Sequence, residues 1–167
     1  IGCYYLSCIR PGALGEGRRF ANEDEAMMAY LTGQIHLQAK IYVRIARERE
    51  GKTYRRTIET SLGRLILNSN VPQDMGFKPR NTLDDMFALE IDTKVGKKEL
   101  GRIVDMCFRK HGVSKTAEVL DAVKAMGYKY STIGAVTVAV ADVIVPPEKK
   151  PILEAAEKQV RQVEKLF

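Results

Sequence analysis

The stretch "IHLQAKIYVRI", residues 35–45, decides the predicted fold because apolar and polar residues alternate along its whole length. A period of two is typical of a β-strand with one face buried. The apolar side comprises Ile35, Leu37, Ala39, Ile41, Val43 and Ile45. The polar segment "REREGKTYRR" then predicts a turn around Gly51, and "TIETSL", residues 57–62, predicts the returning strand of a hairpin.

Helical patterns flank this hairpin. In "ANEDEAMMAYLTG", residues 21–33, Asn22 is suited to cap a helix, Glu25 stands three residues later, and Gly33 follows the end. A short apolar helix around residues 65–67 is predicted after the hairpin. Residues 71–96 hold prolines and no sustained period, so they predict a connection.

Two further helices are predicted after this connection. In "KKELGRIVDMCFRKHG", residues 97–112, apolar residues recur at helical spacing and Gly112 ends the run. Ser114 is placed to cap the next helix, which is predicted to end at Gly127. Cys107 lies on the apolar face of the first helix, where we expect a small buried side chain.

The run from Ile133 to Val145 carries a single charge, on Asp142. It is too short for a membrane span, which needs about 20 apolar residues. Val136, Val138 and Val140 alternate with small residues, which predicts a strand with something packed closely on its small face.

A terminal helix is predicted from Pro147 or Pro151, because proline is accommodated in a first helical turn. A narrow apolar stripe follows, formed by Ile152, Ala156, Val160, Val163 and Phe167. Such a seam is typical of a coiled coil, and we expect its partner helix to lie outside these residues. The first residue is not Met and the helical pattern continues to the last residue, so we expect a segment of a longer protein.

Together these elements predict an α+β fold, in which a part containing a β-hairpin is followed by a helical part and a protruding C-terminal helix. The 167 residues suffice for one or two small cores, and the net charge of +6 fits either an anionic partner or simple solubility. Three cysteines without CxxC spacing and two histidines match neither a disulfide scaffold nor a zinc site, so we expect reduced thiols in the cytoplasm.

A search for catalytic patterns finds none that is complete. Asp84, Asp85 and Asp92 lack the glycine-punctuated spacing of a cation-binding loop, and solvated loop acids are the better interpretation. The "GALGEG" segment has no following Lys-Ser/Thr and predicts a turn. The sequence therefore predicts no metal site and no catalytic residue in this chain.

Basic residues gather on two of the predicted elements. They could attract phosphates without reading sequence, or simply form solvated faces. One set lies on the hairpin and comprises Lys40, Arg44, Arg47, Arg49, Lys52, Arg55 and Arg56, partly offset by Glu48 and Glu50. The other set lies on the first long helix and comprises Lys97, Lys98, Arg102, Arg109 and Lys110.

Seven segments, in this order, make the chain resemble the bacterial RNA polymerase largest subunit, beta-prime, over essentially its whole length. They are "GCYYLS", "GALGEGRRF", "LQAKIYVRI", "ETSLGRLILN", "KKELGRIVDMCFRKHG", "GYKYST" and "VTVAVADVIVPPEKKPILEAAEKQV". Each segment is only moderately specific, but the probability that seven segments match by chance in the right order and at plausible spacing is very small.

The resemblance implies a division of the chain. Residues 1–72 would be the C-terminal part of the pore region, residues 73–96 a connection, and residues 97–146 the funnel. Residues 147–167 would be the first of two rim helices, cut short. In the family these elements wall the secondary channel, through which nucleoside triphosphates enter and into which the RNA 3′ end is extruded during backtracking.

The resemblance also implies partners and the limits of this chain's chemistry. The full enzyme is a DNA-directed nucleotidyltransferase with beta, alpha, omega and sigma subunits, a DNA template and an RNA transcript. Transcript-cleavage factors dock at the channel rim, and no membrane is involved. The family's Mg²⁺ is held by an aspartate loop outside this chain, so the resemblance implies no cofactor here and an isolated chain without polymerase activity.

Arg18, Arg64 and Asp142 are the matched positions implied to face the channel. Two alternatives stay open, since Arg64 also suits a tie between the hairpin and the next helix, and Asp142 suits a cap or turn. The chain departs from the family at residues 131–135, where "STIGA" replaces a stretch that usually contains arginine. At the family's alarmone site only Asp121 agrees, so that site is not implied.

Two other hypotheses compete with this one. A free-standing basic module that binds RNA or ribosomes would explain the positive charge, but it would normally bury the apolar stripe of the terminal helix. An independent small enzyme is the third hypothesis, and the absence of a convergent acid, base or metal set in the sequence disfavours it.

Overall fold

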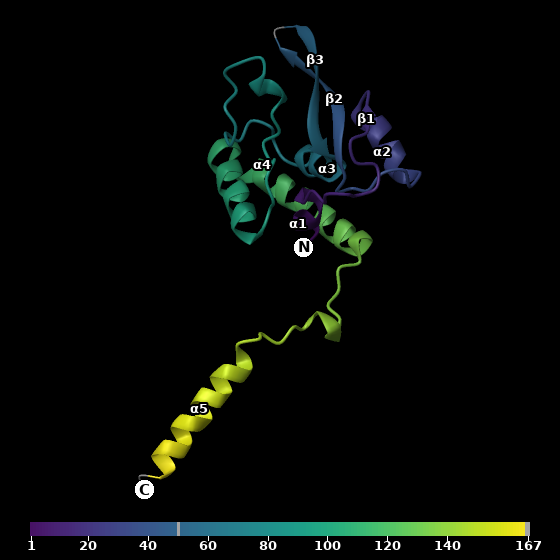
Figure 1. Cartoon of the computed structure of the whole chain (residues 1–167). Coiled ribbons are helices and arrows are strands. Elements are labelled where there is room, and N and C mark those ends of the chain that lie inside the picture. Colours follow the sequence, from purple (N-terminus) through teal and green to yellow (C-terminus); the bar gives the residue numbers. More distant parts are fainter. Residues whose placement is uncertain (50, 166–167) are drawn as a thin grey trace. The chain divides into compact units, whose positions relative to one another are not determined.

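Three strands, in the order β1-β2-β3, form the only sheet in a computed structural model that describes residues 1–49 and 51–165 (Figure 1). Strand β1 (Arg19–Phe20) pairs in parallel with β2 (Lys40–Arg49), and β2 pairs antiparallel with β3 (Lys52–Ser61). The register places Val43 opposite Ile58 and Arg49 opposite Lys52. Gly51 has a φ of 72°, the left-handed conformation that a tight hairpin turn requires. The predicted hairpin is therefore confirmed.

The prediction of one strand over residues 35–45 is wrong for its first five residues. Ile35, Leu37 and Ala39 are buried, as their alternation predicted, but β2 begins only at Lys40. The backbone before it bonds locally and to loops instead of to a strand: the Ala39 amide donates to the His36 carbonyl at 3.0 Å, and the His36 amide donates to the Leu14 carbonyl at 2.9 Å. Alternating burial thus continues through a stretch that is not extended.

Helices α1 (Gly2–Ser7), α2 (Glu23–Leu31) and α3 (Leu62–Ser69) pack around this sheet (Figure 1). Asn22 caps α2 as predicted, because its Oδ1 accepts from the Glu25 amide at 2.7 Å. The Glu25 carboxylate in turn accepts from the Ala21 amide at 2.5 Å. The short apolar helix predicted after the hairpin is α3.

Between α3 and the next helix the chain has no strand, and its one regular element is a 3₁₀ turn, η1 (Asp85–Phe87). This agrees with the predicted connection, yet the segment is well packed. Its apolar side chains complete the core under the sheet, and those that are buried are Val71, Met75, Phe87, Leu89, Ile91 and Val95.

Helix α4 (Lys97–Gly134) consists of two helical halves that meet at Gly112, whose φ of 74° and ψ of −174° are not helical. The two predicted helices are therefore present. Ser114 lies inside the second half and not at a cap, because the break is at Gly112 itself. The predicted end at Gly127 is wrong, since the helix continues to Gly134. A Cβ on Gly2 would collide with the Gly127 backbone, so close packing of α1 on α4 takes place at this point.

Two of the three cysteines are buried in this core. Cys107 is fully buried, as predicted, Cys3 is buried, and all three cysteines are free thiols. Burial raises the pKa of the Cys3 thiol, with the N-terminal charge acting in the opposite direction.

Over residues 1–49 and 51–165, none of the helices combines the length and the apolar character that crossing a membrane demands.

The chain divides into two units, Ile1–Val136 and Thr137–Phe167. The second unit contains a 3₁₀ turn, η2 (Val140–Asp142), and helix α5 (Lys149–Glu164), which has Pro151 in its first turn as predicted. The strand predicted across Val136–Val140 is wrong: the valines there are exposed, and no strand partner lies among the described residues. Without a neighbouring strand to take its hydrogen bonds, alternating sequence alone does not make a strand.

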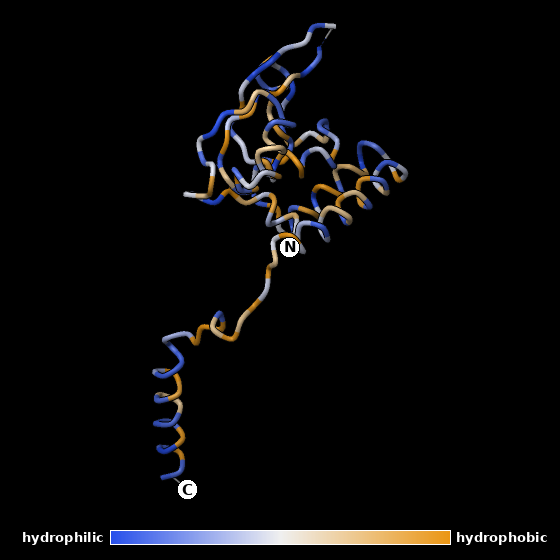
Figure 2. Tube along the Cα trace, turned by 90° about the vertical axis from the view of Figure 1, so that its right-hand side faces the viewer, coloured by the Kyte–Doolittle hydropathy of each residue, from blue (hydrophilic) through white to orange (hydrophobic). Residues whose placement is uncertain are grey.

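Helix α5 carries one apolar side and one polar side (Figure 2). Ile152, Val160 and Val163 are each more than half exposed, and Ala156 between them is exposed as well. The last member of the predicted seam, Phe167, lies outside the described residues. The role of this stripe as a seam for a partner helix stays a prediction.

Candidate functional site

Arg64 is the predicted site residue with the most developed surroundings. It lies in the first turn of α3, where the Ser61 hydroxyl accepts from the Arg64 amide at 3.2 Å and caps the helix. The Arg64 Nε donates to the Ser7 carbonyl at 3.0 Å, which joins α3 to the end of α1. This is not the predicted tie between the hairpin and the next helix, because the Arg64 side chain joins α3 to α1 instead. Burial lowers the pKa of the Arg64 guanidinium, with the charge of Asp92 acting in the opposite direction.

A cavity of about 460 Å³ lies beside Arg64, between the end of β3 and the η1 loop. Its volume falls in the range of about 300–1,000 Å³ that holds small molecules in proteins. Residues of β3 from Arg56 to Thr60 line one side. The loop around η1 lines the other side with Asp84, Asp85, Phe87, Ala88 and Leu89. Arg56 crosses this opening to form an ion pair with Asp84.

The acids that line the cavity already have partners. The Glu59 carboxylate lies 2.8 Å from the Lys40 ammonium, and Asp92 lies 2.6 Å from Lys78. The Asp85 carboxylate accepts from the Thr82 amide at 2.9 Å, and this hydrogen bond is the main reason why the pKa of Asp85 is lowered. Among the described residues, Arg64 forms no ion pair within 4 Å, so its charge is the least compensated one on the cavity wall.

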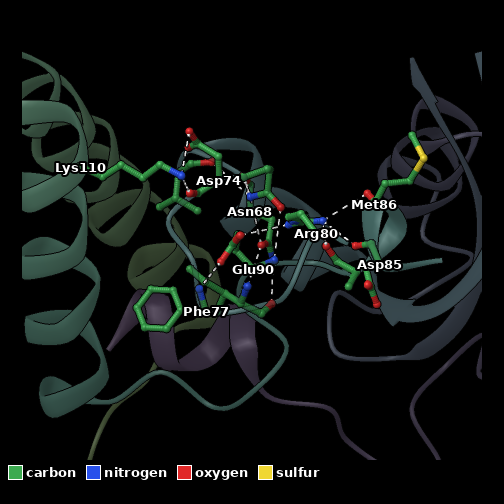
Figure 3. Close-up of polar contacts among 12 residues, drawn as sticks. Asn68, Asp74, Phe77, Arg80, Asp85, Met86, Glu90 and Lys110 are labelled. Atoms are coloured by element: carbon green, nitrogen blue, oxygen red, sulfur yellow. Dashed lines mark hydrogen bonds and ion pairs between the residues drawn. The ribbon is translucent and has the colours of Figure 1, made fainter. Parts of the chain in front are cut away.

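One wall of the cavity is held in place by a buried ion pair, Arg80 with Glu90 (Figure 3). The Glu90 side chain is completely buried; it accepts from Arg80 Nη2 at 3.1 Å and from the Phe77 amide at 2.9 Å. Arg80 Nη1 donates to the carbonyls of Asp85 and Ala88 at 2.9 and 2.8 Å, within the η1 loop. This pair therefore fixes the backbone that lines the cavity.

Asn68 fixes the other end of the same loop (Figure 3). Its Oδ1 accepts from the Ile91 amide at 2.9 Å, and its Nδ2 donates to the Ile91 carbonyl at 2.7 Å. The amide thus pairs with the backbone as a neighbouring strand would, which satisfies buried groups that have no strand partner. Gln73 extends the network by donating to the Asn68 carbonyl at 2.8 Å.

The other two predicted site residues lie elsewhere. Arg18 is exposed and its Nη1 donates to Gln34 Oε1 at 2.9 Å. Asp142 closes the η2 turn, where its carboxylate accepts from the Ala139 amide at 2.7 Å, so the turn role considered for it is present. Arg18 and Arg64 donate to different acceptors, Gln34 and Ser7, and Asp142 belongs to the second unit. That these three side chains face a channel stays a prediction.

Asp74 and the two histidines form contacts within the fold. No group of three or more His, Cys, Asp or Glu residues within residues 1–49 and 51–165 is arranged to hold a metal ion. Asp74 accepts from His111 Nε2 at 2.9 Å and also pairs with Lys110, which joins the connection to α4 just before its break. The Tyr5 hydroxyl lies within hydrogen-bond distance of His36 Nε2, at 3.4 Å, and burial lowers the pKa of the His36 imidazole.

The network formed by Arg80, Glu90 and Asn68 was not predicted from the sequence. Its only signal is a glutamate between apolar residues in "FALEI", residues 87–91, inside a segment interpreted as a plain connection. Because the arginine lies ten residues before Glu90 in irregular backbone, no helical or strand spacing relates the two residues. Only the folded loop brings them together.

The chain is similar to proteins that share one description, the beta′ subunit of DNA-directed RNA polymerase. A family model described as RNA polymerase Rpb1, domain 3, matches residues 1–143. The DNA-directed RNA polymerase subunit beta′ of Clostridium acetobutylicum is 48% identical over all 167 residues, and that of Clostridium novyi is 47% identical over the same length. The subunit of Caldanaerobacter subterraneus subsp. tengcongensis is 45% identical. The whole chain is covered in each case, and it spans 14% of the length of each relative.

Proposed function

The chain belongs to the family of RNA polymerase Rpb1, domain 3, and on this premise we propose that it is a non-catalytic segment of a polymerase beta-prime subunit that walls the secondary channel. The observation that carries the proposal is the match along the whole chain to relatives named as this subunit. Nucleoside triphosphates would enter through this channel, and the RNA 3′ end would be extruded into it.

Arg64 supports the proposal because it is a held cation beside an open cavity. Its Nε is fixed on the Ser7 carbonyl, so the guanidinium cannot swing freely, and it has no carboxylate partner within 4 Å among the described residues. A fixed positive charge on a channel wall attracts phosphate groups and raises their local concentration. Arg64 would therefore guide anionic nucleotides, and the Arg80–Glu90 pair would keep the opposite wall in place.

The work of the segment would be geometric, with bond chemistry performed by other parts of the enzyme. The acids beside the cavity are engaged in ion pairs and hydrogen bonds, and among residues 1–49 and 51–165 no group of three or more His, Cys, Asp or Glu side chains is placed to hold a metal ion. Catalytic Mg²⁺ would be bound outside this chain. The beta, alpha, omega and sigma subunits, the DNA template, the RNA transcript and transcript-cleavage factors would be partners of the assembled enzyme.

Site-specific photocrosslinking in a reconstituted polymerase tests this proposal. A photoreactive amino acid is placed at position 18, 64 or 142 of this segment, and backtracked complexes with a radiolabelled RNA 3′ end are irradiated. We expect crosslinks to the extruded RNA from position 64, and from at least one of the other two positions. A matched control carries the same amino acid at Met28, an exposed residue of α2 that is not among the proposed channel residues.

Two results would contradict the proposal. One is an enzyme that elongates normally but gives no crosslink from any of the three positions. The other is equal crosslinking from position 28 and position 64, which would mean general proximity instead of a channel wall. A free-standing RNA-binding module, the alternative function, would instead predict tight, sequence-specific binding of RNA by this chain alone at physiological salt.

A further inference from the structure

The distal hairpin, residues 44–49 and 51–56, is a protruding ribbon with strong positive charge. The sequence from 44 to 56 contains six arginines and lysines against two glutamates. The ribbon extends past the helices of its unit (Figure 1), and its far end is predominantly hydrophilic (Figure 2). Neither the cavity beside Arg64 nor the proposed channel wall accounts for this charge.

The cations of this hairpin differ in whether a described carboxylate pairs with them. Arg56 pairs with Asp84 in the η1 loop. In contrast, Arg44, Lys52 and Arg55 are exposed and form no ion pair within 4 Å with any described residue. Exposed cations that form no ion pair keep their full charge to attract an anion.

The strand register places two of these cations side by side. Ala46 lies opposite Arg55, and Arg44 lies opposite Thr57, so Arg44 and Arg55 are diagonal neighbours on one face of the ribbon. Lys52 lies opposite Arg49 at the tip. Arg44 and Arg55 therefore share one face of the ribbon, where Glu48 also lies, and they line a hollow together with Glu23 and Asp24. Arg49 and Lys52 lie on the opposite face at the tip.

The same surface lacks what a protein partner would need. Within residues 44–49 and 51–56, no large apolar side chain is exposed, because Ile45 is only 3% exposed and Tyr54 is half-buried. Protein interfaces have an apolar, often aromatic centre, whereas nucleic-acid interfaces are polar and strongly positive. Repeated cations on a ribbon that a groove of duplex DNA can admit match a row of phosphates.

We propose that the distal hairpin binds the phosphodiester backbone of nucleic acid without reading its sequence. Arg44, Lys52 and Arg55, with Arg47 behind them, would neutralise phosphates and release counterions. Because the surface contains no exposed aromatic side chain for base stacking, contacts with bases would add little. The proposal does not depend on the channel-wall function and would hold if that function failed.

The salt dependence of binding tests the proposal with the full 167-residue chain. Fluorescence anisotropy gives the Kd for a labelled duplex DNA of random sequence, and in a second arm for a single-stranded RNA. For about four phosphate contacts, the affinity for duplex DNA should fall about 100-fold between 50 mM and 200 mM salt. The Arg44→Gln/Arg55→Gln variant should retain only about a 10-fold dependence, because each lost contact removes about one unit of the slope.

The matched control is Lys97→Gln/Lys98→Gln, which removes the same charge from exposed positions at the start of α4. It should bind nearly as the unmodified chain does, and far-UV circular dichroism should show that both variants are folded. Lys52→Gln alone should reduce the slope by about one unit. Equal losses in the hairpin and control variants would overturn the proposal, because binding would then reflect net charge. Competition by polyglutamate as effective as that by DNA would overturn it too, in favour of an acidic polypeptide.

Discussion

Removing the Glu90 carboxylate is the perturbation whose effect the structure specifies most closely. Its side chain is completely buried, whereas that of Arg80 is 28% exposed. In Glu90→Ala, the Phe77 amide loses an acceptor at 2.9 Å, and Arg80 Nη2 loses one at 3.1 Å. The arginine would remain beside the core with one anionic partner gone, although its carbonyl contacts in the η1 loop persist.

The expected loss follows from these contacts. Breaking a buried ion pair by removal of one partner costs about 3–5 kcal/mol, because the other charge is left uncompensated. Arg80 keeps some access to water, so the lower end applies and we expect Glu90→Ala to reduce the free energy of unfolding by about 3 kcal/mol. Glu90→Gln retains an oxygen that can accept from the Phe77 amide, and its cost should be about 1–2 kcal/mol.

Urea unfolding followed by far-UV circular dichroism gives the free energy of unfolding from the midpoint and slope. The matched control is Glu118→Ala, which removes one partner of the exposed Lys115–Glu118 pair and should leave the midpoint unchanged. A loss for Glu90→Ala below about 1 kcal/mol, or one equal to that of the control, would refute the role assigned to the buried pair.

Four further substitutions test other parts of the account. Gly63→Ala should destabilise the chain by about 1–3 kcal/mol, because a Cβ there would collide with the Leu6 carbonyl. Gly101 has open space around it, so Gly101→Ala should stabilise α4 by about 0.5–1 kcal/mol. Thermal unfolding compares the two variants. Asn22→Ala should cost about 1 kcal/mol through loss of the α2 cap, and an unchanged urea midpoint would contradict that. Burial raises the pKa of Asp74, but the hydrogen bond and charge of His111, together with Lys110, lower this pKa overall. The stabilising effect of the Asp74 carboxylate is therefore complete above its unfolded-state pKa of about 3.9, and it is lost as the pH falls through the lower folded-state pKa. Asp74→Asn should therefore reduce the difference in the free energy of unfolding between about pH 5 and pH 3, and an unaltered difference would contradict this assignment.

The sequence predicted those elements whose signals are local. The Asn22 cap, the turn at Gly51 and the end of a helical run at Gly112 each depend on a few neighbouring residues, and all three are present. The alternation from Ile35 to Ile45 correctly predicted which side chains are buried. It could not show that residues 35–39 bond to turns and loops instead of to a strand, because that depends on distant backbone such as Leu14.

Predictions that needed a partner far along the chain were less successful. The valines from 136 to 140 have the composition of a strand, but a strand also needs a neighbour to receive its hydrogen bonds, and none lies in the described part of the chain. Gly127 predicts a helix end from its local sequence, whereas in the structure it is a point of close contact with Gly2. At the candidate site, the prediction singled out Arg64 but not the Arg80–Glu90 pair that shapes the facing wall, because irregular backbone carries no periodic signal.

The most direct test of the central claim is a cryo-EM structure of an assembled polymerase that contains this segment, captured with backtracked RNA. The account predicts that the extruded RNA 3′ end passes the cavity beside Arg64, with its phosphates nearer to that guanidinium than to Met28. A map in which the RNA leaves by another route, while Arg64 and its cavity are covered by protein, would contradict the channel-wall function.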